Sequence, residues 1–484
     1  MLFRSKHLVI DGQQRLTTIA LLLCALRRIL DGAHAARIED YLVNRHYQGP
    51  DHFKLVPTNA DRDAFCQMVK MGDCPESNVL RAVRLFEKKL QGDDLDDAPI
   101  EPTRVLETLE QCLQVVMINL GETDDPYLIF ESLNYKGEPL TQADLVRNYV
   151  LMRFSHSLEP GGEQELVYSQ LWRPIELSLG EHLTEFLRHY SMKDGELTRK
   201  GGIYASTKAR FTSLGDLDAV RAELVTMRHH SDAYSRIANP EREARPSISL
   251  RLSTFRDFDV TTCYPLLLRL FEFNRVGAVT DDELEKCLTY IESYIVRRAI
   301  VGVAPNVLNR LFVTWSKNIS TQDVSKQLHG MIIGTTGRGR WPKDEEVKPA
   351  FVSQSQYGRK WTRQILVRLE GAFEHKEPPD LEDCTIEHVM PQTLSDEWVA
   401  ALGVDHASIH DRSLHTIGNL TLSAYNGPLS NLPFNEKKQI FLESHLELNK
   451  DIAKQTEWSE TQILNRGERL FEIANKLWPG PAAT

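Results

Sequence analysis

The sequence predicts a multidomain protein that is predominantly α-helical, with smaller α+β parts. Its 484 residues exceed what one ordinary hydrophobic core organises, so about two to four domains are expected. Across residues 140–312 apolar side chains recur almost continuously at helical spacing, which predicts a helical middle domain. Short strand-like runs lie towards both ends of the chain, which places mixed α/β structure there.

The composition is that of a globular protein without a membrane span. Hydrophobic residues make up 41% and charged residues 26%, with no long biased tract. The most apolar run, residues 19–26, is far shorter than the roughly 20 residues that cross a bilayer. The first residues also lack the long apolar stretch of a signal peptide. We therefore expect no membrane contact and a cytoplasmic location.

Charge and cysteine usage exclude two further classes. A formal net charge of -11 argues against a protein that binds nucleic acid over its whole surface, because such binding relies on basic residues. The net charge does not exclude a protein that binds nucleic acid in a local basic groove. The cysteines have no C-x-x-C spacing and an odd count, which indicates buried thiols rather than a disulfide framework or zinc site.

The first expected domain, residues 1–150, combines strands and helices. Residues 7–10 form a short apolar run, Asp11 and Gly12 make a turn, and residues 14–30 follow with helical periodicity. A second strand is expected at residues 115–120, V-V-M-I-N-L. A glycine- and charge-rich stretch near residue 334 then separates a helical middle domain, residues 151–345, from a C-terminal domain, residues 346–484.

The C-terminal domain carries residue types suited to phosphodiester hydrolysis. This reaction needs a base for water, a divalent ion and groups that hold the phosphate. In T-I-E-H-V-M-P-Q, His388 fits the base, while Glu387 and Asn426 supply hard oxygen ligands for Mg²⁺ or Mn²⁺. Two other Glu-His pairs occur, but only this one is combined with V-M-P and a later G-N-L-T-L at hairpin distance.

This arrangement closely resembles the HNH, or ββα-metal, nuclease family. The resemblance implies that Glu387 is a metal ligand and His388 the general base. It implies further that Asn419 acts at the catalytic site by pinning the intervening loop, and that Asn426 is the second metal ligand, with Asn431 as the alternative.

The same resemblance implies a helix near residues 435–446 whose Lys437 and Lys438 contact DNA phosphate. Adjacent residues on a regular strand point to opposite faces. Glu387 and His388 can therefore share a metal site only where the strand bends or ends, and Pro391 favours an end there.

The turn D-G-Q-Q-R-L-T-T near the N-terminus is a candidate anion site. Gly12 allows a tight turn, and the N-terminus of the following helix offers N–H groups to a phosphate. An equal alternative is that Asp11 caps the helix and Arg15 is merely solvated. No G-x-x-x-x-G-K-[ST] occurs, so a P-loop is excluded.

A second N-terminal motif reads F-E-S-L-N-x-x-G-x-x-L-T-x-A-D-L-V-R-N. Thr141 and Asp144 are spaced as a helix capping box, which explains part of it structurally. Together with D-G-Q-Q-R-L-T-T it resembles the ParB-related nucleotide-hydrolysing domain of GmrSD-type proteins, whose other half is this same kind of HNH domain. The two-part resemblance spans nearly the whole chain.

The resemblance implies a modification-dependent restriction endonuclease of bacterial phage defence, in which a nucleotide-binding domain controls cleavage of modified DNA. Such domains usually begin several tens of residues before D-G-Q-Q-R, whereas this sequence opens ten residues before Asp11, so weak binding of a nucleoside triphosphate is expected. The implied nucleotide pocket contains Asp11, Gln13, Gln14 and Arg15, with Glu131, Asn134 and Asp144 as weaker candidates.

The leading interpretation is a Mg²⁺-dependent HNH endonuclease that acts on modified phage DNA, with NTPase activity as an accompanying option. One alternative is a DNA-binding or sensor subunit of a defence system with a weak or vestigial nuclease. Another is a nuclease that needs no nucleotide. A homo-oligomer and a defence-system partner are both compatible with the sequence.

Overall fold

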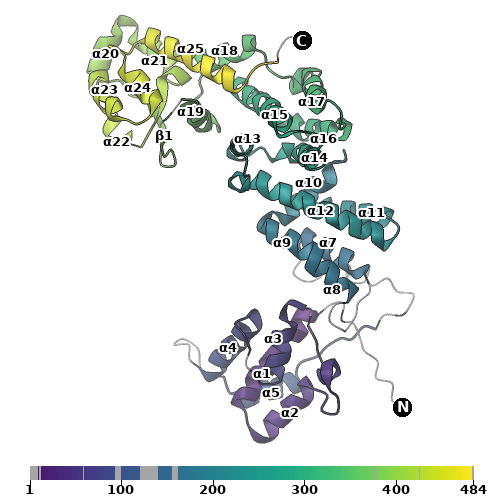
Figure 1. Cartoon of the computed structure of the whole chain (residues 1–484). Helices are drawn as coiled ribbons and strands as arrows, with labels where there is room; N and C mark the ends of the chain where they lie inside the picture. Colours follow the sequence, from purple (N-terminus) through teal and green to yellow (C-terminus); the bar gives the residue numbers. More distant parts are fainter. Residues whose placement is uncertain are drawn as a thin grey trace. The chain divides into compact units, whose positions relative to one another are not determined.

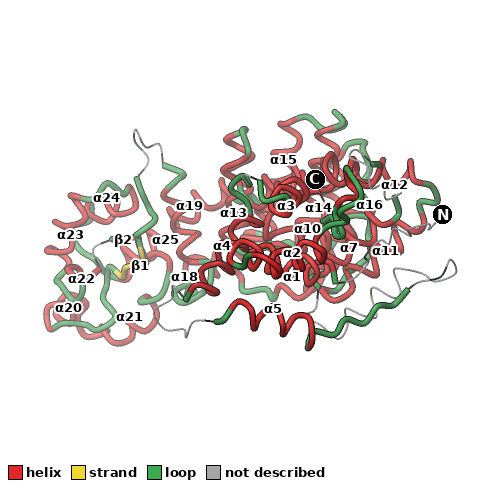
Figure 2. Tube along the Cα trace, turned by 90° about the horizontal axis from the view of Figure 1, so that it is seen from below, coloured by secondary structure: helices red, strands yellow, loops and turns green. Residues whose placement is uncertain are grey.

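The computed structural model describes residues 9, 12–57, 59–72, 74–92, 100–119, 121, 140–154, 162–373, 375, 377, 379–424 and 426–481. These residues are mostly helical and contain one two-stranded sheet (Figure 2), which confirms the predominantly α-helical class. The chain divides into two compact units, Met1–Pro174 with Lys208–Arg221, and Ile175–Thr207 with Ala222–Thr484. The predicted domain limits at residues 150 and 345 stay a prediction.

The elements have the following bounds. Up to residue 167 the α-helices are α1 (Gln13–Ile29), α2 (Gly32–Leu42), α3 (Asn59–Val69), α4 (Asn78–Gln91), α5 (Pro102–Gln111), α7 (Gln142–Met152) and α8 (Glu163–Val167). The helical middle of the chain contains α9 (Arg173–Leu179), α10 (Leu183–Met192), α11 (Ile203–Ser213), α12 (Leu217–Ala238), α13 (Pro246–Asp257), α14 (Tyr264–Arg275), α15 (Asp281–Val301), α16 (Leu308–Asn318) and α17 (Val324–Ile333). The C-terminal part contains α18 (Asp344–Ser353), α19 (Thr362–Glu370), β1 (Thr385–His388), α20 (Asp396–Leu402), α21 (His406–Ser413), the 3-10 turn η10 (Ile417–Asn419), β2 (Leu420–Ser423), α22 (Asn426–Leu429), α23 (Phe434–Glu443), α24 (Glu447–Ala453) and α25 (Glu460–Leu477).

Helix α1 forms the centre of the first unit (Figure 1). It follows the helix predicted at residues 14–30, and its buried side chains, Leu23 and Leu26 among them, pack where α2, α4 and α5 meet it. Gly12 precedes the helix in the left-handed region, at φ 87°, a conformation that costs glycine little. The predicted turn and helix are therefore confirmed from Gly12 onwards.

One of the two strands expected in the first unit, at residues 115–120, differs from the structure. Residues 115–118 belong to a stretch without regular secondary structure, and their apolar side chains are exposed, Val116 to 85%. Within the described part of this unit, strand-like pairing is limited to one bridge between Val43 and Phe53. β-branched residues favour a strand only where a neighbouring strand accepts their backbone hydrogen bonds. Residues 7, 8 and 10 of the other expected strand lie outside the described residues, and the ParB-like fold stays a prediction.

The helical middle region agrees with its periodicity. In α15 the predicted apolar face is buried, with Leu284, Leu288 and Ile291 fully enclosed. The hydroxyl of Thr280 caps the helix by accepting a hydrogen bond from the Glu283 N–H at 3.2 Å. Among the described helices, none combines the length and the apolar character that crossing a bilayer requires.

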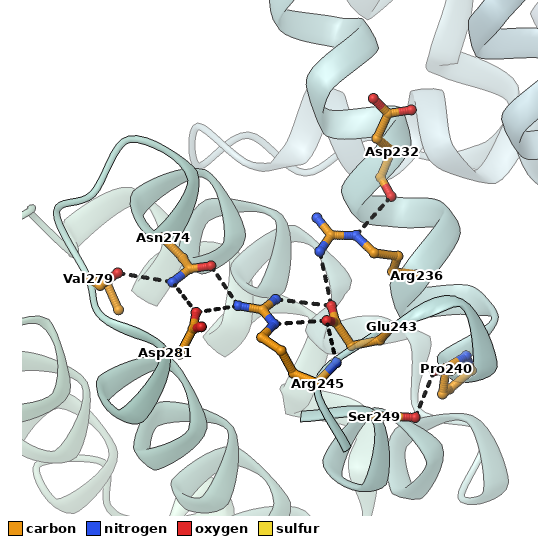
Figure 3. A network of polar contacts seen from close by, with 9 residues as sticks. All are labelled: Asp232, Arg236, Pro240, Glu243, Arg245, Ser249, Asn274, Val279 and Asp281. Carbon is orange, nitrogen blue, oxygen red and sulfur yellow. Dashed lines mark hydrogen bonds and ion pairs between the residues drawn. The ribbon is translucent and has the colours of Figure 1, made fainter. Parts of the chain in front are cut away.

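A network of charged groups braces α13, α14 and α15 (Figure 3). The buried Glu243 carboxylate accepts two hydrogen bonds from the Arg245 guanidinium, at 2.8 and 3.0 Å, one from the Arg245 backbone N–H at 3.2 Å, and one from Arg236 at 3.0 Å. Arg245 also donates to Asn274 on α14 and to Asp281 at the start of α15. A buried carboxylate is tolerated when its oxygen atoms are paired and hydrogen-bonded in this way.

The C-terminal part is built around the hairpin of β1 and β2. The strands are antiparallel, with His388 opposite Leu420 and Glu387 opposite Thr421. A hydrophobic core that includes Val389 and Met390 lies where β1 ends. The turn η10 packs closely on α25, because a side chain at Gly418 would clash with the carbonyl oxygen of Ile463. The hairpin is thus fixed against the last long helix, while its assignment as a ββα-metal fold stays a prediction.

Candidate active site

Glu387 and His388 are adjacent on β1 but have different partners. The Lys437 ammonium donates to Glu387 Oε1 at 2.9 Å, whereas the His388 ring contacts His415 and Tyr357. This is the behaviour of neighbouring residues on a regular strand, whose side chains leave opposite faces. Lys437 also donates to the carbonyl oxygen of His388 at 2.8 Å. It therefore binds both the Glu387 side chain and the backbone of the last residue of β1.

Asn419 fixes the end of β1 to the turn before β2. Its Oδ1 accepts hydrogen bonds from the Met390 N–H at 2.7 Å and the Trp458 indole at 3.0 Å. Its Nδ2 donates to the carbonyl oxygens of Met390 at 3.0 Å and Leu414 at 2.9 Å. The side chain is fully buried and uses both amide atoms, so its geometry is that of a positioning residue.

Two aromatic residues that sequence reasoning missed complete the surroundings of His388. His388 Nε2 lies 3.1 Å from His415 Nδ1, at hydrogen-bonding distance. The Tyr357 ring lies edge-on to His388, at 4.4 Å between centroids, and stacks on His415 at 5.2 Å. His415 stands four residues before Asn419 in H-T-I-G-N, which could have drawn attention to it, whereas no sequence pattern marks Tyr357.

Burial and neighbouring basic groups keep His388 neutral. Burial lowers the pKa of His388 to about 4, and His415, Lys437 and His410 act in the same direction. The imidazole is therefore unprotonated at neutral pH, the form that can accept a proton. Burial raises the pKa of Glu387, and the Lys437 ammonium opposes that rise.

The two lysines of α23 are placed differently from the DNA contacts expected of them. Lys437 has 0% of its side chain exposed and faces Glu387 rather than solvent. It lies between Phe434 and Phe441 on the buried face of α23, three and four residues away. Lys438 is partly buried and donates to the carbonyl oxygen of Gln455 at 2.8 Å. In this arrangement Lys437 serves as the counter-ion of Glu387.

The oxygen donors near Glu387 suit a cation. Glu387 Oε1 and the His388 carbonyl oxygen already hold a cationic group, the Lys437 ammonium. Mg²⁺ commonly uses one or two protein carboxylates and keeps several waters, so a small donor set is sufficient. Asn426 begins α22 close after β2, but its side chain lies outside the described part of the chain, and Asn431 is exposed. The described residues contain no cluster of three or more His, Cys, Asp or Glu side chains arranged for a metal.

Comparison with protein families decides the wider identity of the chain. Residues 341–473 match the C-terminal domain of GmrSD restriction endonucleases, and residues 2–151 match the N-terminal domain of the same family. The chain belongs to the GmrSD restriction endonuclease family. The C-terminal match contains all the residues around His388 described above. A comparison with curated proteins found no match.

In the GmrSD N-terminal domain the predicted nucleotide residues are only partly described. Gln13, Gln14 and Arg15 form the first turn of α1, after Gly12. Asp144 completes the predicted capping box, accepting from the Thr141 N–H at 3.3 Å, and pairs with Arg147 at 3.0 Å. The remaining candidates, Asp11, Glu131 and Asn134, lie outside the described residues. A structural role thus accounts for Asp144, and the nucleotide pocket stays a prediction.

Proposed function

We propose that this chain is a metal-dependent HNH endonuclease that cuts or nicks modified DNA, with His388 as its general base. The observation that carries the proposal is the placement of His388 at the end of β1, where its buried imidazole lies 3.1 Å from His415. Membership of a restriction endonuclease family supports DNA as the substrate.

In the proposed reaction His388 takes a proton from a water molecule. The resulting hydroxide forms a bond to phosphorus while the bond from phosphorus to the 3'-oxygen breaks, and solvent protonates that oxygen. Glu387 and Asn426 would hold Mg²⁺ or Mn²⁺, which stabilises negative charge on the phosphate and the departing oxygen. Asn419 keeps the end of β1 in place through its four hydrogen bonds.

Control by nucleotide is part of the proposal. The GmrSD N-terminal domain would bind a nucleoside triphosphate beside Gln13, Gln14 and Arg15, regulate cleavage and have the capacity to hydrolyse the nucleotide. Phage defence, through recognition of modified phage DNA, is the biological role we infer. Assembly as a homo-oligomer or with a defence partner is compatible with this role.

One observation favours the second candidate, a DNA-binding or sensor subunit with a weak nuclease. Lys437 pairs with the only carboxylate among the described candidate metal ligands, so its ammonium competes with a divalent cation for Glu387.

A cleavage assay separates the two candidates. The full chain is incubated with modified and unmodified phage DNA, with and without Mg²⁺ and each nucleoside triphosphate, beside His388→Ala. Cleavage of modified DNA that requires Mg²⁺ and His388 supports the endonuclease. Retarded migration of modified DNA without any strand break supports the binding subunit and overturns the nuclease.

A further inference from the structure

His415 is fixed next to His388 by two kinds of contact, backbone hydrogen bonds and ring stacking. It follows α21 and precedes η10, and its carbonyl oxygen accepts hydrogen bonds from the backbone N–H groups of Gln356, at 2.8 Å, and Tyr357, at 3.2 Å. The Tyr357 ring then lies nearly parallel to the His415 ring, with 12° between their planes. Backbone and ring contacts thus come from the same short loop after α18, and together they fix where His415 Nδ1 points.

The contact between the two histidines constrains their protons. A neutral imidazole has one N–H donor and one acceptor nitrogen, so across the 3.1 Å contact one ring donates and the other accepts. If His415 Nδ1 donates, the lone pair of His388 is engaged at Nε2 and cannot take a proton from water. If His388 Nε2–H donates to His415 Nδ1, the lone pair of His388 is at Nδ1 and available.

We propose that His415 is a positioning residue that accepts a hydrogen bond from His388 Nε2–H and so holds His388 in the tautomer with a free Nδ1. This inference rests on the proposed role of His388 as general base. When His388 Nδ1 takes the proton, the ring becomes an imidazolium and its Nε2–H donates a charge-assisted hydrogen bond to His415, which is stronger than the neutral one. Tyr357 contributes by keeping the His415 ring in its plane.

Two substitutions of His415 separate the hydrogen bond from the ring packing. In His415→Asn, Oδ1 can accept a hydrogen bond at about the position of Nδ1, while in His415→Phe the ring can still stack on Tyr357 but accepts nothing. We expect His415→Phe to lower kcat about 10-fold, the effect of one lost hydrogen bond, with KM for DNA unchanged. His415→Asn should stay within about 3-fold of the wild type by keeping that bond.

His406→Ala is the matched control, because His406 starts α21 on the surface and bonds only locally, to the Gly403 carbonyl oxygen at 3.0 Å among the described contacts. It should cleave as the wild type does. Thermal unfolding by circular dichroism checks that each variant is folded. A His415→Phe variant that is folded and fully active, or a His415→Asn variant as impaired as His415→Phe, overturns the inference.

A second measurement needs no activity. Long-range ¹H–¹⁵N spectra of the ¹⁵N-histidine-labelled chain report which ring nitrogen carries the proton, and the His388→Ala spectrum identifies the His388 signals. We expect the Nε2–H tautomer of His388 in the wild type and in His415→Asn, and a smaller share of this tautomer in His415→Phe. A wild-type His388 with the proton on Nδ1 overturns the inference.

The cleavage assays distinguish failure of the proposed function from failure of the positioning role. If His388→Ala still cleaves DNA, the proposed function itself fails. If only His415→Phe cleaves normally, the positioning role alone fails.

Discussion

Glu387 and His388 show how two adjacent residues acquire opposite electrostatic roles. Burial disfavours the charged form of both side chains. Glu387 has the Lys437 ammonium at 2.9 Å, whereas the groups around His388 are themselves basic. The carboxylate is therefore compensated, and the imidazole stays neutral. The end of β1 thus presents an oxygen donor with a counter-ion on one face and an uncharged base on the other.

The base assignment predicts a specific pH profile. A general base works only when unprotonated, so kcat/KM should rise with pH through the pKa of His388, about 4, and be independent of this group above it. His388→Ala should lower kcat by about 10²- to 10⁴-fold without unfolding the chain. Plasmid nicking measured from pH 3 to 8, a range that includes the pKa of His388, tests both. Wild-type cleavage by His388→Ala would remove His388 from the mechanism.

The same pKa predicts how stability depends on acid. His388 has its pKa lowered from 6.5 in the unfolded chain to about 4 in the fold, so the unfolded state binds more protons between these values. Its contribution to stability is therefore present above pH 6.5 and is lost as the pH falls towards 4. Urea unfolding of wild type and His388→Gln should differ in slope against pH in this window. Identical slopes would contradict the burial of a neutral imidazole.

Lys437 should matter for stability more than for DNA affinity. Lys437→Met leaves Glu387 buried without its counter-ion, which costs about 3 to 5 kcal/mol of unfolding free energy, measured in urea. Adding Glu387→Gln should restore part of the loss. Lys438→Met is the neighbouring control and should change stability by less than about 1 kcal/mol. Equal effects of the two lysine substitutions would show that Lys437 is not the buried partner of Glu387.

At the scale of elements, the hairpin depends on how closely η10 lies on α25. Arg466, buried in α25, donates to the carbonyl oxygens of Gly418 and Leu420, both at 2.8 Å, which satisfies backbone groups of the turn. The absence of a side chain at Gly418 allows that approach. Asn419 belongs to the same turn and bonds to the backbone just after β1. The packing of α25 on η10 therefore helps to position the end of β1, and with it His388.

Gly418→Ala should consequently destabilise the C-terminal part by about 1 to 3 kcal/mol, because the new methyl group meets backbone atoms of α25 that cannot rotate away. Gly330→Ala in α17 is the matched control, since nothing lies within 4 Å of the place that its new methyl group would take, and it should be neutral or slightly stabilising. Chemical denaturation gives both values. A Gly418→Ala protein as stable as the wild type would mean that η10 and α25 are not in tight contact.

The elements that the sequence predicted are those with local causes. The periodicity of α1 and α15 and the capping box of Thr141 and Asp144 depend on residues a few positions apart, so they could be predicted. The strand expected at residues 115–120 depends on a partner, which periodicity does not supply. His415 and Tyr357 meet His388 through tertiary packing alone. The inward direction of Lys437 is visible in its spacing from Phe434 and Phe441, but lysines are mostly surface residues, so the sequence alone favoured a contact with DNA.

At the scale of the whole molecule, the GmrSD match assigns two domains of one restriction enzyme to a single chain. The residues proposed for the nucleotide belong to the first compact unit, and those proposed for cleavage belong to the second. The proposed control of cleavage by nucleotide would therefore require communication between the two units. Binding in the first unit is the step of this control that can be measured by itself.

The nucleotide prediction concerns the first turn of α1. The N-terminus of a helix attracts a phosphate through its N–H groups and dipole. An ion pair between the phosphate and the exposed Arg15 adds about 0.2 to 1 kcal/mol. Arg15→Ala should therefore weaken binding of a nucleoside triphosphate by a factor of about two to five, measured by calorimetric titration.

Arg45→Ala is the control, because Arg45 is an exposed arginine of the same unit that pairs with Asp40 at 2.8 Å. His388→Ala should bind nucleotide as the wild type does, since its loss affects only the chemical step in the second unit. Equal binding by Arg15→Ala and Arg45→Ala would place the nucleotide away from α1, and the anion site proposed at the start of this helix would be wrong.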